Sequence, residues 1–178
     1  MTRAIPFAAA ALAGAVVLAL CLAVTGGSRT AERSAPAPAA TWKAPDGSFS
    51  IATPAGWKAV ANGSAATVLQ RADKRGVVVI RRRAAVTAPL SRLAGQLQRR
   101  LRGQIADFEP AGSRLATVGG TQGLVYTFVR PVANQVQSVV VAPAGDRSYT
   151  LDLVADGDAP DVARELAAMV RSFTPKHA

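Results

Sequence analysis

The chain has few of the side chains that enzymes commonly use as nucleophiles, bases or metal ligands. It has 178 residues with one cysteine, Cys21, and one histidine, His177. Cys21 lies in an apolar stretch near the N-terminus, and His177 is the penultimate residue. A Ser–His–Asp triad needs a histidine held inside the fold, and transition-metal sites draw mainly on cysteine and histidine. We therefore expect no catalytic residue, no metal site and no cofactor.

Paired glutamates and aromatic clusters are scarce as well. Beyond the N-terminal region the glutamates are Glu109 and Glu165, and nothing in the sequence brings them together for acid–base chemistry. Aromatic residues make up 5% of the chain, and they are scarce in its basic segment, where nucleic-acid bases would need to stack. We expect no nucleic-acid partner. The aromatic residues expected to pack in or beside the core are Trp42, Trp57, Tyr126 and Tyr149.

The N-terminal region has the pattern of a secretory signal. Arg3 is followed by an uncharged run from Ala4 to Val24 that is mostly Ala, Leu and Val. A basic start before an apolar run is typical of a signal peptide. At about 1.5 Å per residue, a helix of this length spans about 31 Å and would cross a bilayer, so an uncleaved signal anchor is a second interpretation.

A third interpretation involves Cys21. Residues 18–21, Leu-Ala-Leu-Cys, resemble a bacterial lipobox, although Leu20 stands where a small residue is usual. The alternative is that Cys21 is simply a small apolar residue of a membrane helix. Cleavage, anchoring and lipid attachment all place the remaining chain outside the cytoplasm. We therefore predict a protein that is anchored to the cytoplasmic membrane or secreted.

Composition divides the chain into three parts. Residues 1–27 form the predicted signal peptide or signal anchor, and residues 28–40 are rich in Ser, Ala and Pro, which predicts a stalk. Residues 41–178 are enough for one domain with its own core.

Within the predicted domain, β-branched runs and alternating polarity indicate strands. Residues 77–80, Val-Val-Val-Ile, are the clearest example. A turn at residues 54–57, Pro-Ala-Gly-Trp, should return the indole of Trp57 to the core, and Gly119 with Gly120 should close a hairpin. The predicted strands cover residues 49–52, 66–70, 76–83, 112–118, 123–130, 135–142 and 148–155.

Two segments change to helical spacing. Apolar residues recur every three or four positions from Leu90 to Phe108, and again from Val162 to Phe173. Asp158 is expected to cap the second helix, and Asp161 adds negative charge to its first turn. The arginines of the first helix are expected on the side opposite its apolar stripe.

The order of elements is three strands, a helix, four strands and a final helix. Successive strands joined by short turns pair antiparallel, and the helices must cover the apolar faces of the sheet. The sequence therefore predicts an α+β fold, an antiparallel sheet flanked by helices in an α/β/α sandwich. Because Leu97 and Leu101 should face the sheet, we expect that replacing either by alanine costs about 2–5 kcal/mol.

Three motifs resemble those of PsbP-like proteins. Residues 49–57, Phe-Ser-Ile-Ala-Thr-Pro-Ala-Gly-Trp, look like the family's opening strand and Pro-x-Gly-Trp turn. Residues 119–126 resemble its mid-domain hairpin, and residues 148–153 followed by a helix that ends Arg-Ser-Phe resemble its C-terminal part. The resemblance covers residues 42–174 and is closest in style to actinobacterial LpqN-type envelope proteins.

The resemblance implies a sheet flanked by helices and a role in binding other proteins. The fold is shared by a photosystem extrinsic subunit, a Ran-binding import factor and actinobacterial envelope lipoproteins, and it implies no common set of catalytic residues. We therefore transfer no functional residue to this chain. The resemblance favours a non-catalytic accessory domain of the cell envelope, with an unknown envelope protein as its partner.

The net charge of +10 is unevenly distributed. Residues 71–102 hold ten basic side chains against Asp73, whereas residues 146–165 hold six acids against two arginines. If the first helix meets the end of the preceding strand, their arginines form a basic patch that would attract anionic lipid or a cell-wall polymer. The alternative is a solvated face in a chain whose arginine content reflects a GC-rich genome. The patch candidates are Arg81, Arg82, Arg83, Arg92, Arg99, Arg100 and Arg102.

Four aspartates near the C-terminus invite a calcium interpretation. Their spacing lacks the glycine and the terminal glutamate of an EF-hand loop. We favour the interpretation that they belong to a turn and a helix cap, and we expect no metal there. These residues are Asp152, Asp156, Asp158 and Asp161.

Overall fold

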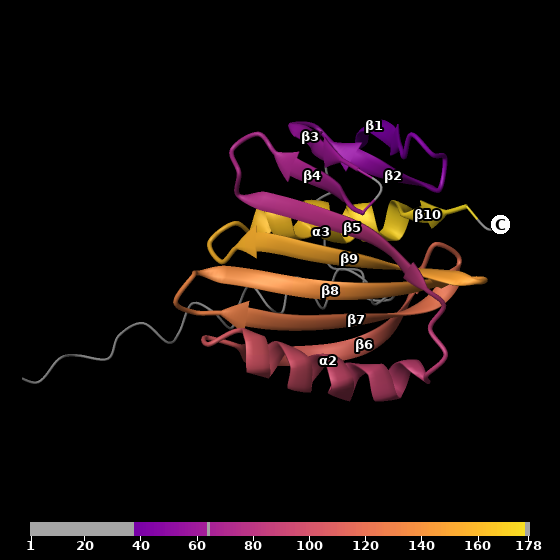
Figure 1. Cartoon of the computed structure of the whole chain (residues 1–178). Coiled ribbons are helices and arrows are strands. Elements are labelled where there is room, and N and C mark those ends of the chain that lie inside the picture. Colours follow the sequence, from indigo (N-terminus) through magenta and orange to yellow (C-terminus); the bar gives the residue numbers. More distant parts are fainter. Residues whose placement is uncertain (1–37, 64, 177–178) are drawn as a thin grey trace, which may run out of the picture.

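Figure 1 shows the computed structural model of the chain, which describes residues 38–63 and 65–176. The strands that precede the first described helix are β1 (Pro38–Lys43), β2 (Phe49–Pro54), β3 (Trp57–Asn62), β4 (Thr67–Arg71) and β5 (Gly76–Ala84). They are followed by α2 (Leu90–Gln104), β6 (Glu109–Val118), β7 (Thr121–Arg130), β8 (Gln135–Ala144), β9 (Arg147–Asp156), α3 (Pro160–Ser172) and β10 (Thr174–Pro175).

Several predictions from the sequence fall outside the described residues. They concern the leader with Cys21, residues 28–37 of the predicted stalk, and His177. β1 begins at Pro38, so the folded part starts slightly before the predicted boundary at Thr41. Neither helix of the described part has both the length and the hydropathy that a membrane crossing requires.

The strands form two antiparallel sheets. The larger sheet has the order β3-β4-β5-β9-β8-β7-β6, and the smaller has the order β1-β2-β10. In Figure 1, α3 lies behind the large sheet and α2 lies along its lower front edge. This arrangement confirms the predicted α+β fold, an antiparallel sheet flanked by helices. It adds β1, β3 and β10 to the strands that the sequence predicted.

The main core lies between the large sheet, α3 and β2. Alternation along β9 turns Tyr149, Leu151 and Leu153 toward α3, whose apolar stripe is buried against them as predicted. The rings of Phe49, Tyr149 and Phe173 lie 5.4–5.9 Å apart and join β2, β9 and the end of α3. This side of the sheet is therefore closely covered.

Gly76 shows how closely this core is packed. A Cβ atom at this position would lie 2.6 Å from Val162 Cγ1 and 2.7 Å from the indole of Trp57. The absence of a side chain at Gly76 therefore lets the backbone of β5 pack directly against α3 and the indole of Trp57. The predicted return of Trp57 to the core is confirmed, since its side chain is buried.

A second, smaller core lies on the opposite face of the sheet, beneath α2. Tyr126 and Phe128 of β7 are buried there, and the apolar stripe of α2 packs against them. The helix ends at Gln104, earlier than predicted, because Ile105 adopts an extended backbone with φ −123°. The stripe continues nevertheless, as the ring of Phe108 lies 5.2 Å from that of Phe128.

The predicted cap of the final helix is wrong. The N-cap residue of α3 is Ala159, and no side chain of the described residues bonds to the first amides of the helix. Asp158 is instead 2.7 Å from the guanidinium of Arg75. The ion pair draws this carboxylate toward the β4–β5 turn and away from the helix. Asp161, in contrast, lies in the first turn as expected.

Candidate functional site

The candidate site is a groove of about 720 Å³ between α2 and the front face of the large sheet, hereafter the α2 groove. Its walls come from α2 on one side and from β5, β8 and β9 on the other. The apolar side chains that line it are Ala84, Val86, Leu93, Leu97, Leu101, Val139 and Val141, and the polar ones are Arg81, Arg83, Arg100, Gln104, Ser148, Thr150 and Asp152.

Strand register explains why charged residues reach this groove. On β5, Arg81 pairs with Thr150 and Arg83 pairs with Ser148 of β9, which places all four side chains on the front face. Arg82 lies between the two arginines in sequence and points to the opposite face, where its guanidinium is 3.5 Å from Asp46. Two of the three consecutive arginines therefore belong to the groove.

Asp152 is the acidic residue of the α2 groove. Its carboxylate forms an ion pair with Arg81, and its side chain is about one-third exposed, at 33%. Burial raises the pKa of Asp152, whereas the charges of Arg81, Arg83 and Arg100 lower it without outweighing the effect of burial. Three guanidinium groups therefore act on one carboxylate, and the polar part of the groove carries a net positive charge.

The structure brings together only part of the predicted arginine patch. Arg100 was expected on the outer side of the helix, but it lines the α2 groove beside Leu97 and Leu101. A residue three positions from Leu97 still lies on the same side of a helix, which explains the error. The outer, exposed surface of α2 carries the remaining candidates, which are Arg92, Arg99 and Arg102.

Beside the groove, part of the front face of the sheet is not covered by α2. The helix packs on β6 and β7, whereas half-exposed valines of β4, β5 and β9 lie on the remaining part of this face. The strand pairs Val68–Val79 and Val77–Val154 place these side chains next to one another. We call Val68, Val77, Val79 and Val154 the valine surface.

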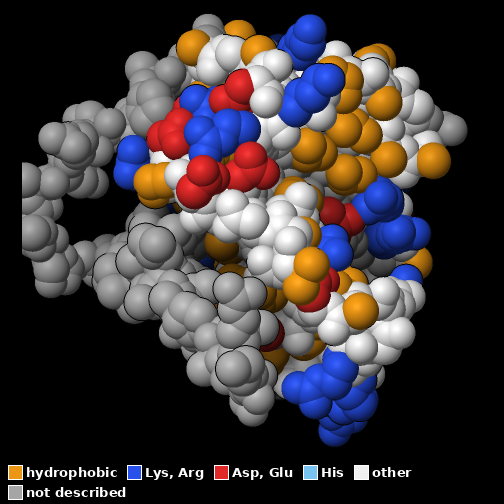
Figure 2. All heavy atoms as spheres, turned by 90° about the vertical axis from the view of Figure 1, so that its left-hand side faces the viewer, with side chains coloured by type: hydrophobic (Ala, Val, Ile, Leu, Met, Phe, Trp, Pro, Cys, Tyr) orange, Lys and Arg blue, Asp and Glu red, His pale blue; other side chains and the backbone are white. Residues whose placement is uncertain are grey.

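Figure 2 shows the molecule from the end at which α3 begins. Apolar side chains gather at the upper right, on the side where β3, β4 and β5 present their front faces, and basic side chains project at the bottom, on the side of α2. Acidic and basic side chains mix at the upper left, toward the back of the sheet. The apolar area thus lies on the front of the sheet, the basic side chains at the bottom lie on the side of α2, and the mixed charges lie toward the back of the sheet.

The four aspartates that invited a calcium interpretation each pair with an arginine. Arg75 lies 3.4 Å from Asp156 and 2.7 Å from Asp158, and Arg71 lies 2.8 Å from Asp161. Asp152 pairs with Arg81 in the groove. Every one of these carboxylates is therefore held by an arginine, and their role is to form ion pairs.

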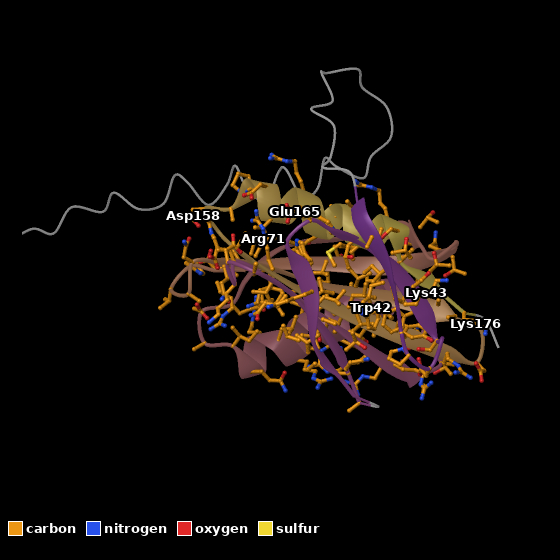
Figure 3. The ribbon with its side chains drawn as sticks, turned by 90° about the horizontal axis from the view of Figure 1, so that it is seen from above. Trp42, Lys43, Arg71, Asp158, Glu165 and Lys176 are labelled. Atoms are coloured by element: carbon orange, nitrogen blue, oxygen red, sulfur yellow. The ribbon has the colours of Figure 1, made fainter. Side chains whose placement is uncertain are left out.

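One member of this charged network is deeply buried. The Trp57 Nε1–H donates a hydrogen bond of 2.7 Å to Glu165, whose side chain is also 3.4 Å from Arg71 Nε. Figure 3 shows Arg71 and Glu165 on the same side of the molecule, with Asp158 nearby at the end of α3. The sequence analysis missed this cluster, although Glu165 falls within the buried stripe of α3. The sequence did hold a signal for this cluster, because a glutamate at a core position of a helix is rarely buried without a charged or hydrogen-bonded partner.

Tyr126 leaves a polar atom in the layer beneath α2. Its side chain is 2% exposed, and its hydroxyl has no hydrogen-bond partner among the described residues. Burial raises the pKa of this phenol, and the charge of Arg102 lowers it to a smaller extent. The α2 side of the sheet therefore contains an unsatisfied hydroxyl, whereas Tyr149 on the α3 side donates to the Ser48 carbonyl at 2.9 Å.

The chemistry of the α2 groove is charge recognition beside an apolar wall. Guanidinium groups stay protonated and donate up to five hydrogen bonds each in a planar fork, which suits carboxylates and phosphates. The single carboxylate is already engaged by Arg81. The arrangement is thus suited to holding an anion.

Comparison with known proteins supports the fold. No protein-family profile matches the chain, and no curated protein matches it in sequence. The structure is similar to that of the Ran-binding protein Mog1p from Saccharomyces cerevisiae, with a TM-score of 0.59 and 11% identity over 78% of this chain and 95% of that chain. It is also similar to CyanoP, the PsbP protein of the cyanobacterium Synechocystis, with a TM-score of 0.58 and 13% identity over 84% of this chain and 98% of that chain.

The fold is therefore that of the PsbP-like proteins, as the motifs indicated. LpqN, involved in cell envelope biogenesis of Mycobacterium tuberculosis, matches with a TM-score of 0.47 and 17% identity over 76% of this chain and 88% of that chain, and adds nothing to this assignment. Identities of 11–13% show a common fold and leave the partner of this chain undefined.

Proposed function

We propose that this chain is a non-catalytic binding domain outside the cytoplasm, and that it binds a protein of the cell envelope through its valine surface. The observation that carries the proposal is the apolar area on β4, β5 and β9 that α2 leaves uncovered. An apolar area bordered by polar groups marks an interaction site more often than a plain surface does. The extracytoplasmic location rests on the leader pattern of residues 1–27.

The charges around the valine surface define the chemistry of the partner. Val79 pairs with Asp152 in the strand register, and Arg81 follows it on the same face. The polar border is therefore rich in guanidinium groups. A partner with an apolar contact area and acidic residues around it would complement this surface. The PsbP-like fold of the Ran-binding protein Mog1p is compatible with such a role.

The proposal is tested by placing a photo-crosslinking amino acid at Val79 in the full chain and irradiating the native envelope. Val132 is the matched control, because it is 89% exposed in the turn between β7 and β8. We expect one partner to be captured from Val79 and not from Val132. The isolated partner should bind the unlabelled full chain, and Val79→Asp should weaken that binding.

Salt dependence decides whether the contact is apolar. Raising the salt concentration from about 0.1 to about 1 M shortens the screening length from about 10 to about 3 Å. Binding through the valine surface should persist under these conditions. Equal capture from both positions, or full binding by Val79→Asp, would contradict the proposal.

A second candidate function is supported by the outer surface of α2. Arg92, Arg99 and Arg102 are exposed there, and within the described residues none of them forms an ion pair. Such a surface would attract anionic lipid headgroups or a cell-wall polymer, with about 1 kcal/mol per nearby cation. Replacing all three by glutamine should abolish binding to anionic liposomes, and that binding should collapse at about 1 M salt. Unchanged liposome binding would exclude this function.

A further inference from the structure

The helix α2 is held more loosely than its sequence requires. It has a continuous apolar stripe, yet none of its fifteen residues, all within the described part of the chain, is buried. Leu93, Leu97 and Leu101 line the α2 groove and are only partly buried, although they pack on the smaller core. The helix also lacks a side-chain N-cap from the described residues, and its first turn contains no acidic residue. One edge of the apolar stripe therefore remains accessible from the groove.

The volume and lining of the groove define the size of an occupant. About 720 Å³ lies within the range of about 300–1,000 Å³ that is typical of small-molecule sites. Val139 and Val141 of β8 line the same groove as the leucines, which pack against them along the edge of the helix. An alkyl chain laid along this groove would remove the partly exposed leucine side chains from water, which is the main source of apolar affinity.

The charged residues define the polar end of an occupant. Arg81 and Arg83 come from β5 and Arg100 comes from α2, and all three act on the carboxylate of Asp152. One acid cannot neutralise three guanidinium groups, so a second anion would improve the charge balance of the site. Arginine pairs with carboxylates through two parallel hydrogen bonds, which fixes the position of a headgroup.

We propose that the α2 groove binds one long-chain fatty acid. Its carboxylate lies among Arg81, Arg83 and Arg100, and its alkyl chain lies along the groove beside α2, against the leucines of the helix and Val86. This ligand goes beyond the proposed protein partner, which contacts the valine surface. It also differs from a bilayer surface, which would be attracted by the outer arginines of α2 and would need no groove beside the helix.

The test uses the full chain in vesicles of phosphatidylcholine, whose headgroup is neutral overall. The probe is a palmitate analogue with a photoactivatable group in its alkyl chain. We expect saturable labelling, with modified peptides from α2 and β8. The same alkyl chain on an uncharged sugar headgroup should label these peptides about tenfold less at equal concentration, because the charge-assisted hydrogen bonds are missing.

Two triple variants provide a matched comparison. Arg81→Gln, Arg83→Gln and Arg100→Gln remove the charges of the groove, whereas Arg92→Gln, Arg99→Gln and Arg102→Gln remove three charges from the outer surface of the same region. The groove variant should need about tenfold more palmitate analogue for half-saturation. The outer variant should match the unmodified chain, since its change in net charge is identical but lies elsewhere.

Two further variants keep the proposal testable if the groove triple fails to fold. Arg100→Gln alone leaves the Arg81–Asp152 pair intact and should weaken labelling several-fold. Leu97→Trp leaves every charge in place and should block the alkyl chain. The proposal is overturned if labelling is equal in the two triple variants, if it spreads over the surface, or if Leu97→Trp leaves it unchanged. Because Arg100→Gln and Leu97→Trp leave both the valine surface and Arg81 beside it intact, partner capture from Val79 in these two variants reports separately on the proposed function.

Discussion

The two faces of the large sheet are covered in different ways. α3 has 13 residues, of which seven are buried, and its N-terminal half is tied to the sheet through Glu165, Trp57 and Arg71. α2 has 15 residues, and none of these described residues is buried. Both helices are amphipathic, so their sequences alone do not account for the contrast.

The difference separates a structural face from a binding face. The α3 side combines close packing with hydrogen bonds and ion pairs that involve Trp57, Arg71 and Glu165, as expected for a part that opens only with global unfolding. The α2 side combines half-exposed leucines, an unsatisfied hydroxyl and a charged groove. Sites that take up ligands need accessible surface and local freedom, which the second arrangement provides.

The largest effect is expected from truncation on the α3 side. Leu166 is 2% exposed within the main core, so Leu166→Ala should destabilise the fold by about 2–5 kcal/mol. Denaturant unfolding of the full chain measures this loss. A cost below that of the α2 variants would break the contrast between the two faces.

A smaller loss is expected from the buried charge on α3. Glu165→Ala removes the acceptor of Trp57 Nε1–H and one partner of Arg71, which should cost about 1–3 kcal/mol. Arg71 keeps Asp161 at 2.8 Å, which limits the cost. The matched control is Arg164→Ala. The side chain of Arg164, which precedes Glu165 in the sequence, is exposed, so its loss should leave the unfolding midpoint almost unchanged.

Truncation on the α2 side should cost less than the sequence indicated. Leu97 faces the sheet as predicted, but it is half-exposed and lines the groove. We now expect Leu97→Ala to cost about 1–2 kcal/mol, because less surface is removed from water and little new cavity forms. A measured loss above about 3 kcal/mol would show that α2 packs as closely as α3.

Tyr126 offers a test with the opposite sign. Removing a buried hydroxyl that has no partner should leave stability unchanged or raise it by up to about 1 kcal/mol, so Tyr126→Phe is expected to unfold no earlier than the unmodified chain. The corresponding change on the α3 side, Tyr149→Phe, breaks the bond to the Ser48 carbonyl and should be destabilising. Tyr149→Phe should therefore melt at a lower temperature than Tyr126→Phe.

The smallest effect concerns pH. The pKa of Asp152 is raised above its ordinary value of 3.8, so the folded state binds this proton more tightly than the unfolded state does. The free energy of unfolding should therefore fall as pH rises above about 3.8. For Asp161, burial raises the pKa but the hydrogen bond and charge of Arg71 prevail, so the pKa is lowered. Its contribution is present above about pH 3.8 and is lost as pH falls below it.

These opposite signs can be read from two variants. The stability of the unmodified chain relative to Asp152→Asn should decrease as pH rises above about 3.8, whereas its stability relative to Asp161→Asn should increase as pH rises toward about 3.8. Denaturation midpoints measured across this range test both. If the midpoints of the unmodified chain, Asp152→Asn and Asp161→Asn changed in parallel with pH, the two aspartates would not differ as predicted.

Local patterns predicted most of the elements correctly. The β-branched residues of β5 and the leucine spacing of α2 appeared where expected, because strand and helix periodicities are properties of neighbouring residues. β3 was missed, since its residues after Trp57 are all exposed and show no alternation of apolar and polar side chains. Asp158 has the right chemistry for a cap, and only the approach of Arg75 from another strand decides that it forms an ion pair.

The groove could be predicted only in part. Arg81, Arg83 and Arg100 were among the candidate arginines, but Arg82 could not be separated from its neighbours until the register of β5 with β9 was known. Asp152 was considered as a metal ligand, and it became the carboxylate of the groove once β9 was placed beside β5. The distance between α2 and the sheet depends on packing among many residues, which no local pattern encodes.

Interactions between residues close in sequence determined the secondary structure and the antiparallel pairing of successive strands. Composition alone established the excess of arginine and the scarcity of histidine and cysteine. Tertiary structure alone decided which face of the sheet is closely covered, which arginines meet Asp152, and that a groove remains beside α2. The physical reason is that periodicity needs only neighbours in sequence, whereas burial and charge pairing depend on residues that folding brings together from distant strands.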